Sequence, residues 1–451
     1  MLSTALAFLL TLAVLIAVHE WGHFQTARWC GVKVLRFSIG FGRVLWRRRL
    51  SRDGAEFTLS ALPLGGYVRM LDSREAPVAP QEMNRAFDRQ PLRKRVAIVA
   101  AGPLANLLLA AVLFALAHWL GTEQPRAVLA SPAAGSLAAQ AGLQPGDWVR
   151  ALEDQGVRRP VRSLTDLRWQ VTQAALEHRP VVLEVTDAQG GHRRDLALAL
   201  DQVQGHDIDA ETWRHIGLPG AYSEPVLGEV MIGGAARDAG LQRGDRVLEV
   251  DGRPVPDAAA LRELIRRGQG AAMLWRVERA GQVLSVSVTP KAVGQGDATQ
   301  WRIEAYLGAA PVTDLVRLGP LDGALAALRQ VGETAGMSLR MLGRMLIGEA
   351  SVKNLSGPLT IADYAGQSAR IGVVEFLVFL ANVSVGLGVL NLLPLPILDG
   401  GHLMYYLFEG LTGRPVSDVW LRRLQRGGAV VLLLMMSIAL SNDVARLLGL
   451  H

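Results

Sequence analysis

The sequence of 451 residues contains very little cysteine and comparatively little charge. Cys30 is its single cysteine, which excludes an intramolecular disulfide and leaves the redox compartment undecided. Charged residues make up 20% of the chain and hydrophobic residues 50%, which is apolar for a soluble protein. The basic residues follow no recognisable nucleic-acid-binding motif, so no nucleic-acid partner is expected. Long hydrophobic runs, in contrast, lie near both ends.

The first hydrophobic run, residues 1–18, has neither a basic beginning nor a small-residue cleavage site. A secretory signal peptide has both, so this run is predicted to be a retained membrane span. About 18 apolar residues are enough for a helix to cross a bilayer. Similar runs lie near residues 96–120, 373–393 and 427–440. The sequence therefore predicts a multi-pass α-helical membrane protein with four transmembrane helices.

Basic residues concentrate in one loop, residues 28–95, which holds 15 Lys and Arg against 6 Asp and Glu. Basic loops beside membrane spans stay in the cytoplasm. The short loop after the third span is basic as well. Together the two loops place both termini, and the long segment after residue 120, on the far side of the membrane.

This far-side segment contains an internal repeat. Residues 141–147 read Ala-Gly-Leu-Gln-Pro-Gly-Asp, residues 239–245 read Ala-Gly-Leu-Gln-Arg-Gly-Asp, and a short β-like run follows each. The pattern resembles PDZ domains, which predicts two mixed α/β modules; two generic β-rich domains are the alternative. PDZ modules bind a peptide end through N–H groups of a short loop. The matching groove residues are Ile216, Gly217 and Leu218 in the first module, and Leu307 and Gly308 in the second.

His19-Glu20-Trp21-Gly22-His23, at the cytoplasmic end of the first span, has the pattern H-E-x-x-H. Residues four apart share one helix face, so both imidazoles can bind one metal ion. Glu20 is rotated by about 100° from His19, where it reaches a water on that ion. Zinc lowers the pKa of such a water to about 7, and the glutamate accepts its proton as hydroxide attacks a carbonyl. Such groups are costly at membrane depth without a function.

A catalytic zinc site needs a third protein ligand. Residues 391–402, at the end of the third span, read Asn-Leu-Leu-Pro-Leu-Pro-Ile-Leu-Asp-Gly-Gly-His. Asp399 is expected at the membrane depth of the two histidines, and His402 is the competing ligand that the residues alone do not exclude. Pro394 and Pro396 are predicted to break the helix and to shape the site, although two simple kinks are the alternative.

H-E-x-x-H in the first span and N-x-x-P-x-P-x-L-D-G-G-H in a late span together resemble the site-2 protease family of intramembrane zinc metalloproteases, peptidase family M50. Residues 102–106, Gly-Pro-Leu-Ala-Asn, are similar to the second core helix of that family. Two PDZ-like modules between these parts are typical of its bacterial RseP-type members. The resemblance implies one zinc ion held by His19, His23 and Asp399, Glu20 as general base, and Asn391 as a contact to the substrate backbone.

The resemblance also implies the substrate and the surroundings. The expected substrate is a single-pass membrane protein, such as an anti-sigma factor already trimmed by a periplasmic site-1 protease, or a remnant signal peptide. The expected location is a bacterial inner membrane, with the modules and termini periplasmic and the active site near the cytoplasmic side. The segments around Phe37 and around Gly65 and Gly66 are similar to a membrane-reentrant β-hairpin whose edge pairs with an unwound substrate. An ordinary cytoplasmic β-ribbon is the alternative.

The predicted order of segments is: span 1 with the metal motif (1–27), basic loop (28–95), span 2 (96–120), PDZ-like modules (121–222 and 223–310), periplasmic linker with an amphipathic helix (311–370), span 3 (371–403), cytoplasmic loop (404–426) and span 4 (427–445). Two other functions are compatible with these features: a membrane-anchored PDZ scaffold with a non-catalytic zinc site, and a metal transporter. Glu20 discriminates between them and a protease, because neither alternative requires a general base.

Overall fold

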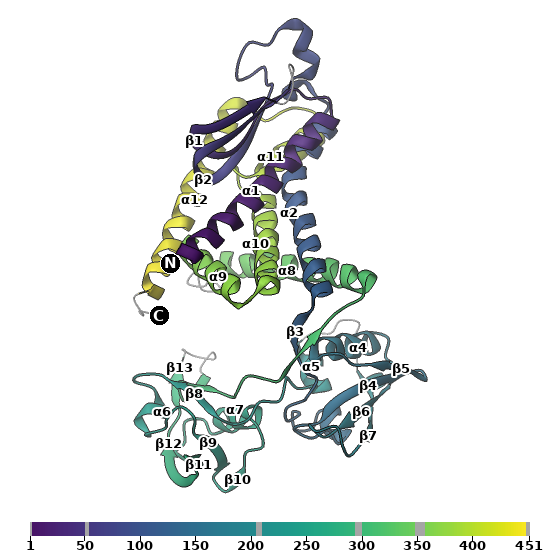
Figure 1. The fold of residues 1–451 in the computed structure, drawn as a ribbon, viewed down its shortest axis with the longest axis vertical. Helices are drawn as coiled ribbons and strands as arrows, with labels where there is room; N and C mark the ends of the chain where they lie inside the picture. Colours follow the sequence, from purple (N-terminus) through teal and green to yellow (C-terminus); the bar gives the residue numbers. More distant parts are fainter. Residues whose placement is uncertain (1, 50–53, 204–209, 294–299, 348–356, 448–451) are drawn as a thin grey trace. The chain divides into compact units, whose positions relative to one another are not determined.

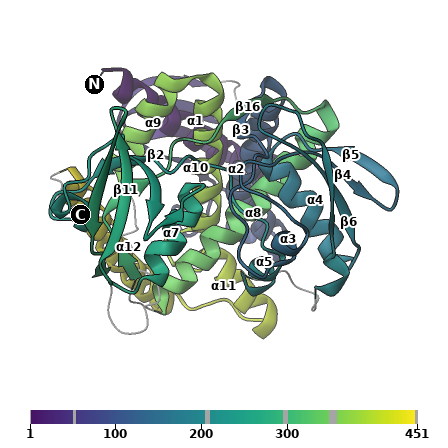
Figure 2. The ribbon, with the colours of Figure 1, turned by 90° about the horizontal axis from the view of Figure 1, so that it is seen from below.

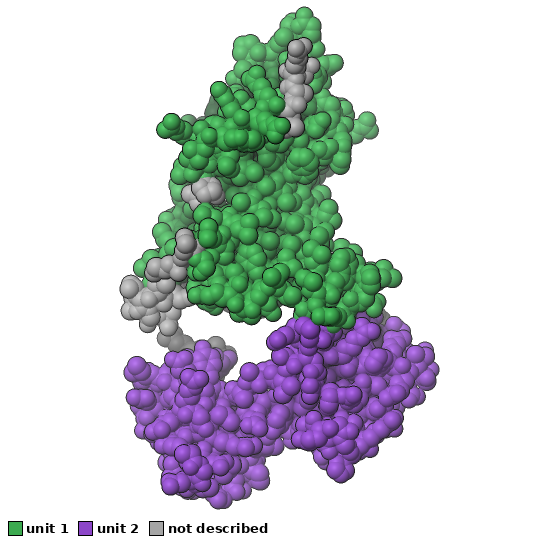
Figure 3. Space-filling view, in the orientation of Figure 1, with its two compact units in different colours: residues 1–122, 317–451 green, residues 123–316 purple. Residues whose placement is uncertain are grey.

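The computed structural model describes residues 2–49, 54–203, 210–293, 300–347 and 357–447. The chain divides into two compact units, residues 1–122 with 317–451 and residues 123–316 (Figure 3). Within the described residues, four helices of the first unit are long and apolar enough to cross a membrane: α1 (Leu2–Trp29), α2 (Leu92–Leu120), α10 (Val373–Leu392) and α12 (Asp418–Leu447). The number of long apolar helices therefore agrees with the four hydrophobic runs.

α1, α2 and α10 pack around one apolar core in the first unit. Small residues allow the close packing: a Cβ on Gly22 of α1 would overlap the carbonyl oxygen of Ala101 in α2. α8 (Pro320–Leu346) and α9 (Pro358–Ile371) run across the end of α10 in Figure 1. Ala327 of α8 is fully buried in the core, whereas Leu321 and Met337 of the same helix are 71% and 69% exposed. The amphipathic character of α8 and its placement on the membrane surface both stay predictions.

Two helices begin before the apolar runs that mark their spans. α2 starts at Leu92 and α12 at Asp418, so each includes basic residues in its first turns. Hydropathy marks only the part of a helix that lies in lipid, whereas backbone hydrogen bonding continues wherever the residues permit a helix. Arginine and lysine tolerate such positions because their long stems can lie on apolar surface while the charge stays in water.

The basic loop between α1 and α2 forms a bent β-ribbon from β1 (Val34–Arg49) and β2 (Glu56–Met70). Residues 34–39 of β1 lie between two stretches of β2 and pair with residues 66–70 on one side and residues 56–59 on the other. On their far side, residues 56–60 pair with residues 44–49. Residues 66–70 consequently form one outer edge of the sheet. Figure 1 shows this sheet beside α1, and Phe37 of β1 packs against Phe24 of α1 with ring centroids 5.6 Å apart.

The second unit contains two four-stranded sheets of the same design. Their strand orders are β5-β4-β6-β7 and β10-β9-β11-β12, so corresponding strands occupy corresponding places. α4 (Leu164–Leu176) lies beside β4 in the first module, as Figures 1 and 2 show, and α7 (Ala258–Arg267) is the matching helix of the second. The elements of this unit, with the strand that leads into it, are β3 (Thr122–Pro125), α3 (Leu137–Gln140), β4 (Trp148–Asp154), β5 (Val157–Pro160), β6 (Val181–Thr186), β7 (Arg194–Leu198), α5 (Ala210–Ile216), β8 (Leu227–Val230), α6 (Ala235–Asp238), β9 (Arg246–Val250), β10 (Arg253–Pro254), β11 (Met273–Arg279), β12 (Gln282–Val288), β13 (Lys291–Val293), β14 (Gln300–Arg302), β15 (Ala305–Leu307) and β16 (Thr313–Val316).

The repeated Gly-Asp ending has the same structural role in both modules. Asp147 accepts a hydrogen bond from the N–H of Gln144 and forms an ion pair with Arg194. Asp245 likewise accepts a hydrogen bond from the N–H of Gln242 and forms an ion pair with Arg279. Each aspartate therefore closes a turn and ties it to a strand. The preceding glycines have positive φ, +89° at Gly146 and +92° at Gly244, which explains why glycine recurs there. These contacts account for the repeat, and the PDZ identity of the modules stays a prediction.

Candidate metal centre

His19 and His23 lie four residues apart on α1, and the fold brings Asp399 to the same place from the beginning of α11 (Asp399–Thr412). The Nε2 atoms of the two histidines are 3.2 Å apart. Asp399 Oδ2 lies 3.2 Å from His19 Nε2 and 3.4 Å from His23 Nε2. Zinc bonds of about 2.0–2.1 Å in a tetrahedron separate neighbouring ligand atoms by about 3.3–3.4 Å. The three atoms therefore have the spacing of three corners around one zinc ion.

The ring orientation of His23 is set by a backbone carbonyl. Its Nδ1 lies 2.8 Å from the carbonyl oxygen of Ile98 in α2. A carbonyl only accepts hydrogen bonds, so Nδ1 carries the proton and Nε2 keeps its lone pair for a metal. Gly102, one turn further along α2, lies directly against the ring, and a Cβ there would overlap Nε2. The glycine of the Gly-Pro-Leu-Ala-Asn segment thus makes room for a ligand.

Asn106 supports the other histidine. It is fully buried, its Nδ2 lies 3.3 Å from Nδ1 of His19, and its Oδ1 has no hydrogen-bond partner among the described residues. Rotating the amide by 180° exchanges oxygen and nitrogen, and the oxygen then accepts a bond from His19 Nδ1–H. Metal-binding histidines usually donate their second N–H in this way. Asn106 is not among the site residues that the sequence predicts, although a buried amide at membrane depth signals that a partner is needed.

Glu20 lies next to the two histidines on α1 and is buried, with 8% of its surface exposed. Gly66 of β2 packs directly on it, since a Cβ at Gly66 would lie 2.8 Å from Glu20 Cγ. Gly65 packs in the same close manner against the ring of Phe41. The outer edge of the β-sheet therefore passes over the carboxylate that the sequence predicts as general base.

The segment before Asp399 is irregular, as the two prolines predict. α10 ends at Leu392 and α11 begins at Asp399, with Pro394 and Pro396 between them. Gly400 and Gly401 let α11 begin against this segment, because a Cβ on either would overlap carbonyl oxygens of residues 392–395. Both prolines thus lie where the helix breaks, and the break turns the chain so that Asp399 reaches α1.

Of the two candidates for the third ligand, Asp399 is the one that lies with the histidines. His402 is one helical turn further on and lines a different pocket, together with Arg422 and Arg426 of α12. Asn391 lies in the last turn of α10, half-buried, and no described hydrogen bond of its side chain tests its predicted contact to a substrate.

The predicted groove residues of the two modules are engaged within the modules themselves. Ile216 and Leu218 are buried in the core of the first module, and the N–H of Gly217 donates to the carbonyl of Trp213. In the second module the N–H of Gly308 donates to the carbonyl of Val226, and the carbonyl of Leu307 accepts from Arg262. Peptide binding at these positions stays a prediction, and it requires these hydrogen bonds to exchange.

Comparison with known proteins adds a family. Residues 7–435 match the family model described as Peptidase family M50. The chain is 42% identical to "Putative zinc metalloprotease RSc1411" of Ralstonia nicotianae (strain ATCC BAA-1114 / GMI1000), with 99% of each chain covered. It is 37% identical to "Regulator of sigma-E protease RseP" of Escherichia coli (strain K12) and 38% identical to "Regulator of sigma E protease" of Salmonella typhi, with 98% of each chain covered in both cases.

Proposed function

Because this chain belongs to peptidase family M50, we propose that it is an intramembrane zinc metalloendopeptidase that hydrolyses a peptide bond in single-pass membrane proteins. The observation that carries the proposal is the meeting of His19, His23 and Asp399 beside Glu20, in a unit whose helices are apolar enough to cross a membrane. A structural zinc site is normally closed by four protein ligands. Three protein ligands leave the fourth position for a water molecule, and the Glu20 carboxylate lies beside it, as hydrolysis requires.

The proposed mechanism divides the work between the ligands and Glu20. One zinc ion per chain, held by His19, His23 and Asp399, would activate a water molecule and polarise the scissile carbonyl. Glu20 accepts the proton of the attacking water and then donates it to the leaving amide nitrogen. Ile98 and Asn106 contact the Nδ1 atoms of the two imidazoles and so leave both Nε2 atoms available as ligands.

A peptide bond within a helix is shielded, so a helical substrate has to unwind before it reaches Glu20. Residues 66–70 form an outer sheet edge, and an extended peptide can add to such an edge through backbone hydrogen bonds. Gly66 packs on Glu20, so a peptide paired at this edge would pass next to the general base. Asn391 would then contact the substrate backbone, and Pro394 and Pro396 would keep the segment before Asp399 non-helical.

The relatives named as regulators of sigma-E protease suggest the biological setting. We propose that the substrate is an anti-sigma factor already trimmed by a periplasmic site-1 protease, with remnant signal peptides as a second class. The protein would lie in a bacterial inner membrane, with both termini and the two PDZ-like modules in the periplasm and the metal centre near the cytoplasmic face. The modules would exclude substrates that have not been trimmed.

Cleavage of a tagged single-pass anti-sigma-like substrate in membranes tests the proposal. Wild type is compared with Glu20→Gln and Asp399→Ala, and zinc content is measured on the same purified proteins. We expect both variants to lose cleavage, Glu20→Gln to keep zinc and Asp399→Ala to lose part of it. Normal cleavage by Glu20→Gln would contradict the catalytic role and favour a membrane-anchored PDZ scaffold whose zinc site is not catalytic.

A further inference from the structure

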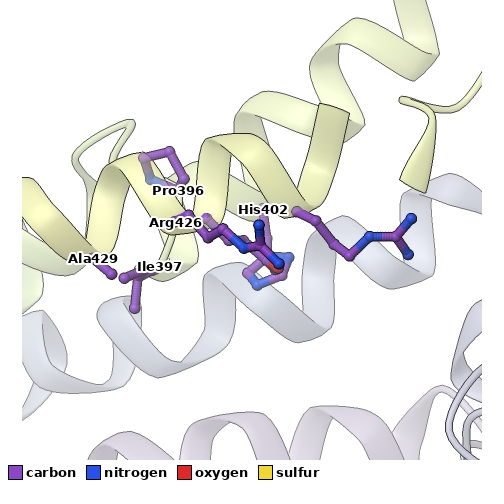
Figure 4. Close-up of a pocket in the computed structure, with 7 residues that line it drawn as sticks. Pro396, Ile397, His402, Arg426 and Ala429 are labelled. Atoms are coloured by element: carbon purple, nitrogen blue, oxygen red, sulfur yellow. The ribbon is translucent and has the colours of Figure 1, made fainter. Parts of the chain in front are cut away.

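One pocket of the first unit is not used by the proposed mechanism. It has a volume of about 380 Å³ and lies between the beginning of α12 and the segment that leads into α11. Figure 4 shows Arg426 and Ala429 reaching it from one helix, and Pro396, Ile397 and His402 from the other side. Arg422 and Gln425 complete the lining.

The lining residues of α12 form one stripe of the helix. Arg422, Gln425, Arg426 and Ala429 follow the spacing i, i+3, i+4 and i+7, which places them on a single face. Both arginines therefore line the pocket from the same face of α12. Like charges at this spacing repel one another, so the pair is favoured when an anion lies between them.

No carboxylate neutralises these two arginines in the part of the chain that the structure describes: neither forms an ion pair or a hydrogen bond there. Other basic residues of the same region are engaged: Arg95 pairs with Glu409, and Arg423 lies over the ring of Trp420. The pocket thus combines two unpaired guanidinium groups with apolar walls from Pro396, Ile397 and Ala429.

The same stripe of α12 continues beyond the pocket as an exposed apolar surface. Leu433, Met436 and Leu440 follow Ala429 at helical spacing and are 62%, 54% and 48% exposed. A ligand that fits both parts has a phosphate at one end and a long hydrocarbon chain at the other. Free phosphate would use only the arginines.

We propose that this pocket binds an anionic phospholipid, with its phosphate between Arg422 and Arg426 and one acyl chain along Leu433, Met436 and Leu440. Guanidinium groups bind phosphate through paired, charge-assisted hydrogen bonds, and basic pockets between helices on the cytoplasmic side suit such headgroups. The assignment rests on the proposed orientation, which puts this end of α12 at the cytoplasmic face. A bound lipid would also brace Pro396 and Ile397, just before Asp399.

Lipid binding to the purified full-length protein in detergent tests the proposal without any proteolysis, so the result is independent of the proposed enzyme activity. Native mass spectrometry would count bound dioleoyl-phosphatidylglycerol, with dioleoyl-phosphatidylcholine and inorganic phosphate as separate arms. We expect phosphatidylglycerol to bind best. The double variant Arg422→Gln/Arg426→Gln should weaken its binding about tenfold or more, since charge-assisted bonds are lost. Arg423→Gln, which removes one positive charge from the same helix outside the pocket, should have no effect.

A second variant guards against a change in folding. Ala429→Trp fills the pocket without altering charge and should displace the lipid, whereas Arg422→Lys/Arg426→Lys keeps the charge and should bind more lipid than the double glutamine variant but less than wild type. Equal binding of phosphatidylglycerol to wild type and to both disruptive variants would overturn the proposal. Tight binding of inorganic phosphate, with no preference for the lipid, would overturn the lipid assignment in favour of a free anion. If the disruptive variants bound lipid like wild type but gave weaker photo-cross-linking to a substrate helix, the pocket would belong to the substrate and the lipid proposal would be overturned.

Discussion

The support of His19 by Asn106 predicts how much zinc affinity depends on a residue that does not touch the metal. Asn106→Leu keeps the branched shape of the side chain and removes the amide that faces His19 Nδ1 at 3.3 Å. The backbone carbonyl of Asn106, which accepts a bond from Ser384 Oγ at 2.8 Å, is unaffected by the substitution. The contact between α2 and α10 is therefore retained, and the effect is confined to the histidine.

Loss of a partner that orients a ligating histidine typically costs about 10–100-fold in metal affinity, or about 1.4–2.7 kcal/mol. The fold itself should change little, because replacing a buried polar group by an apolar group of similar shape is nearly neutral. We expect Asn106→Leu to lose zinc to a competing chelator at about 10–100-fold lower chelator concentration than wild type, with cleavage reduced in parallel. Asn106→Asp keeps an acceptor oxygen and should retain zinc.

Asn382→Leu is the matched control. Asn382 lies on α10, is exposed, and donates to the carbonyl of Val378 in its own helix. Competitive chelation of the purified proteins, followed by metal analysis, compares the four proteins directly. If Asn106→Leu held zinc as tightly as wild type and Asn382→Leu, the proposed contact to His19 would be refuted.

Two further predictions concern the packing around His23 and the turn of the second module. Gly102→Ala places a methyl group against the His23 ring, so it should lower the free energy of unfolding by about 1–3 kcal/mol and lose most of the bound zinc. Gly386→Ala in α10 is the control: no atom lies within 4 Å of its new Cβ, and it should retain zinc in the same metal analysis. Burial would raise the pKa of the Asp245 carboxyl, but hydrogen bonds from the Arg279 guanidinium and the Gln242 N–H outweigh it and hold the pKa below its ordinary value. The ionised carboxylate therefore stabilises the module above its ordinary pKa, and this stabilisation is lost as the pH falls through the lowered pKa of the folded state. The protection of β9 and β11 amides against hydrogen exchange, measured relative to the intrinsic rate at each pH, should fall in acid. In Asp245→Asn this protection should already be lower at neutral pH and should change little with pH; a wild-type protection profile in Asp245→Asn would contradict the role of the carboxylate.

Local spacing alone determined much of this protein. His19, Glu20 and His23 owe their relative placement to the period of one helix, so a pentapeptide was enough to predict two ligands and a candidate base. The four long apolar helices followed from runs of residues that lipid tolerates. The repeated Gly-Asp turns followed from positive φ at Gly146 and Gly244, which is a property of the glycines themselves.

Tertiary structure decided what joins segments far apart in the chain. Asp399 and His402 are separated by a single turn, and only the break at Pro394 and Pro396, with the packing of Gly400 and Gly401, brings the aspartate to α1. Asn106 became a partner of His19 because α1 and α2 pack closely at Gly22. Such contacts depend on which helix faces meet, and that choice is made by the packing of whole side chains in the core, which no short sequence pattern encodes.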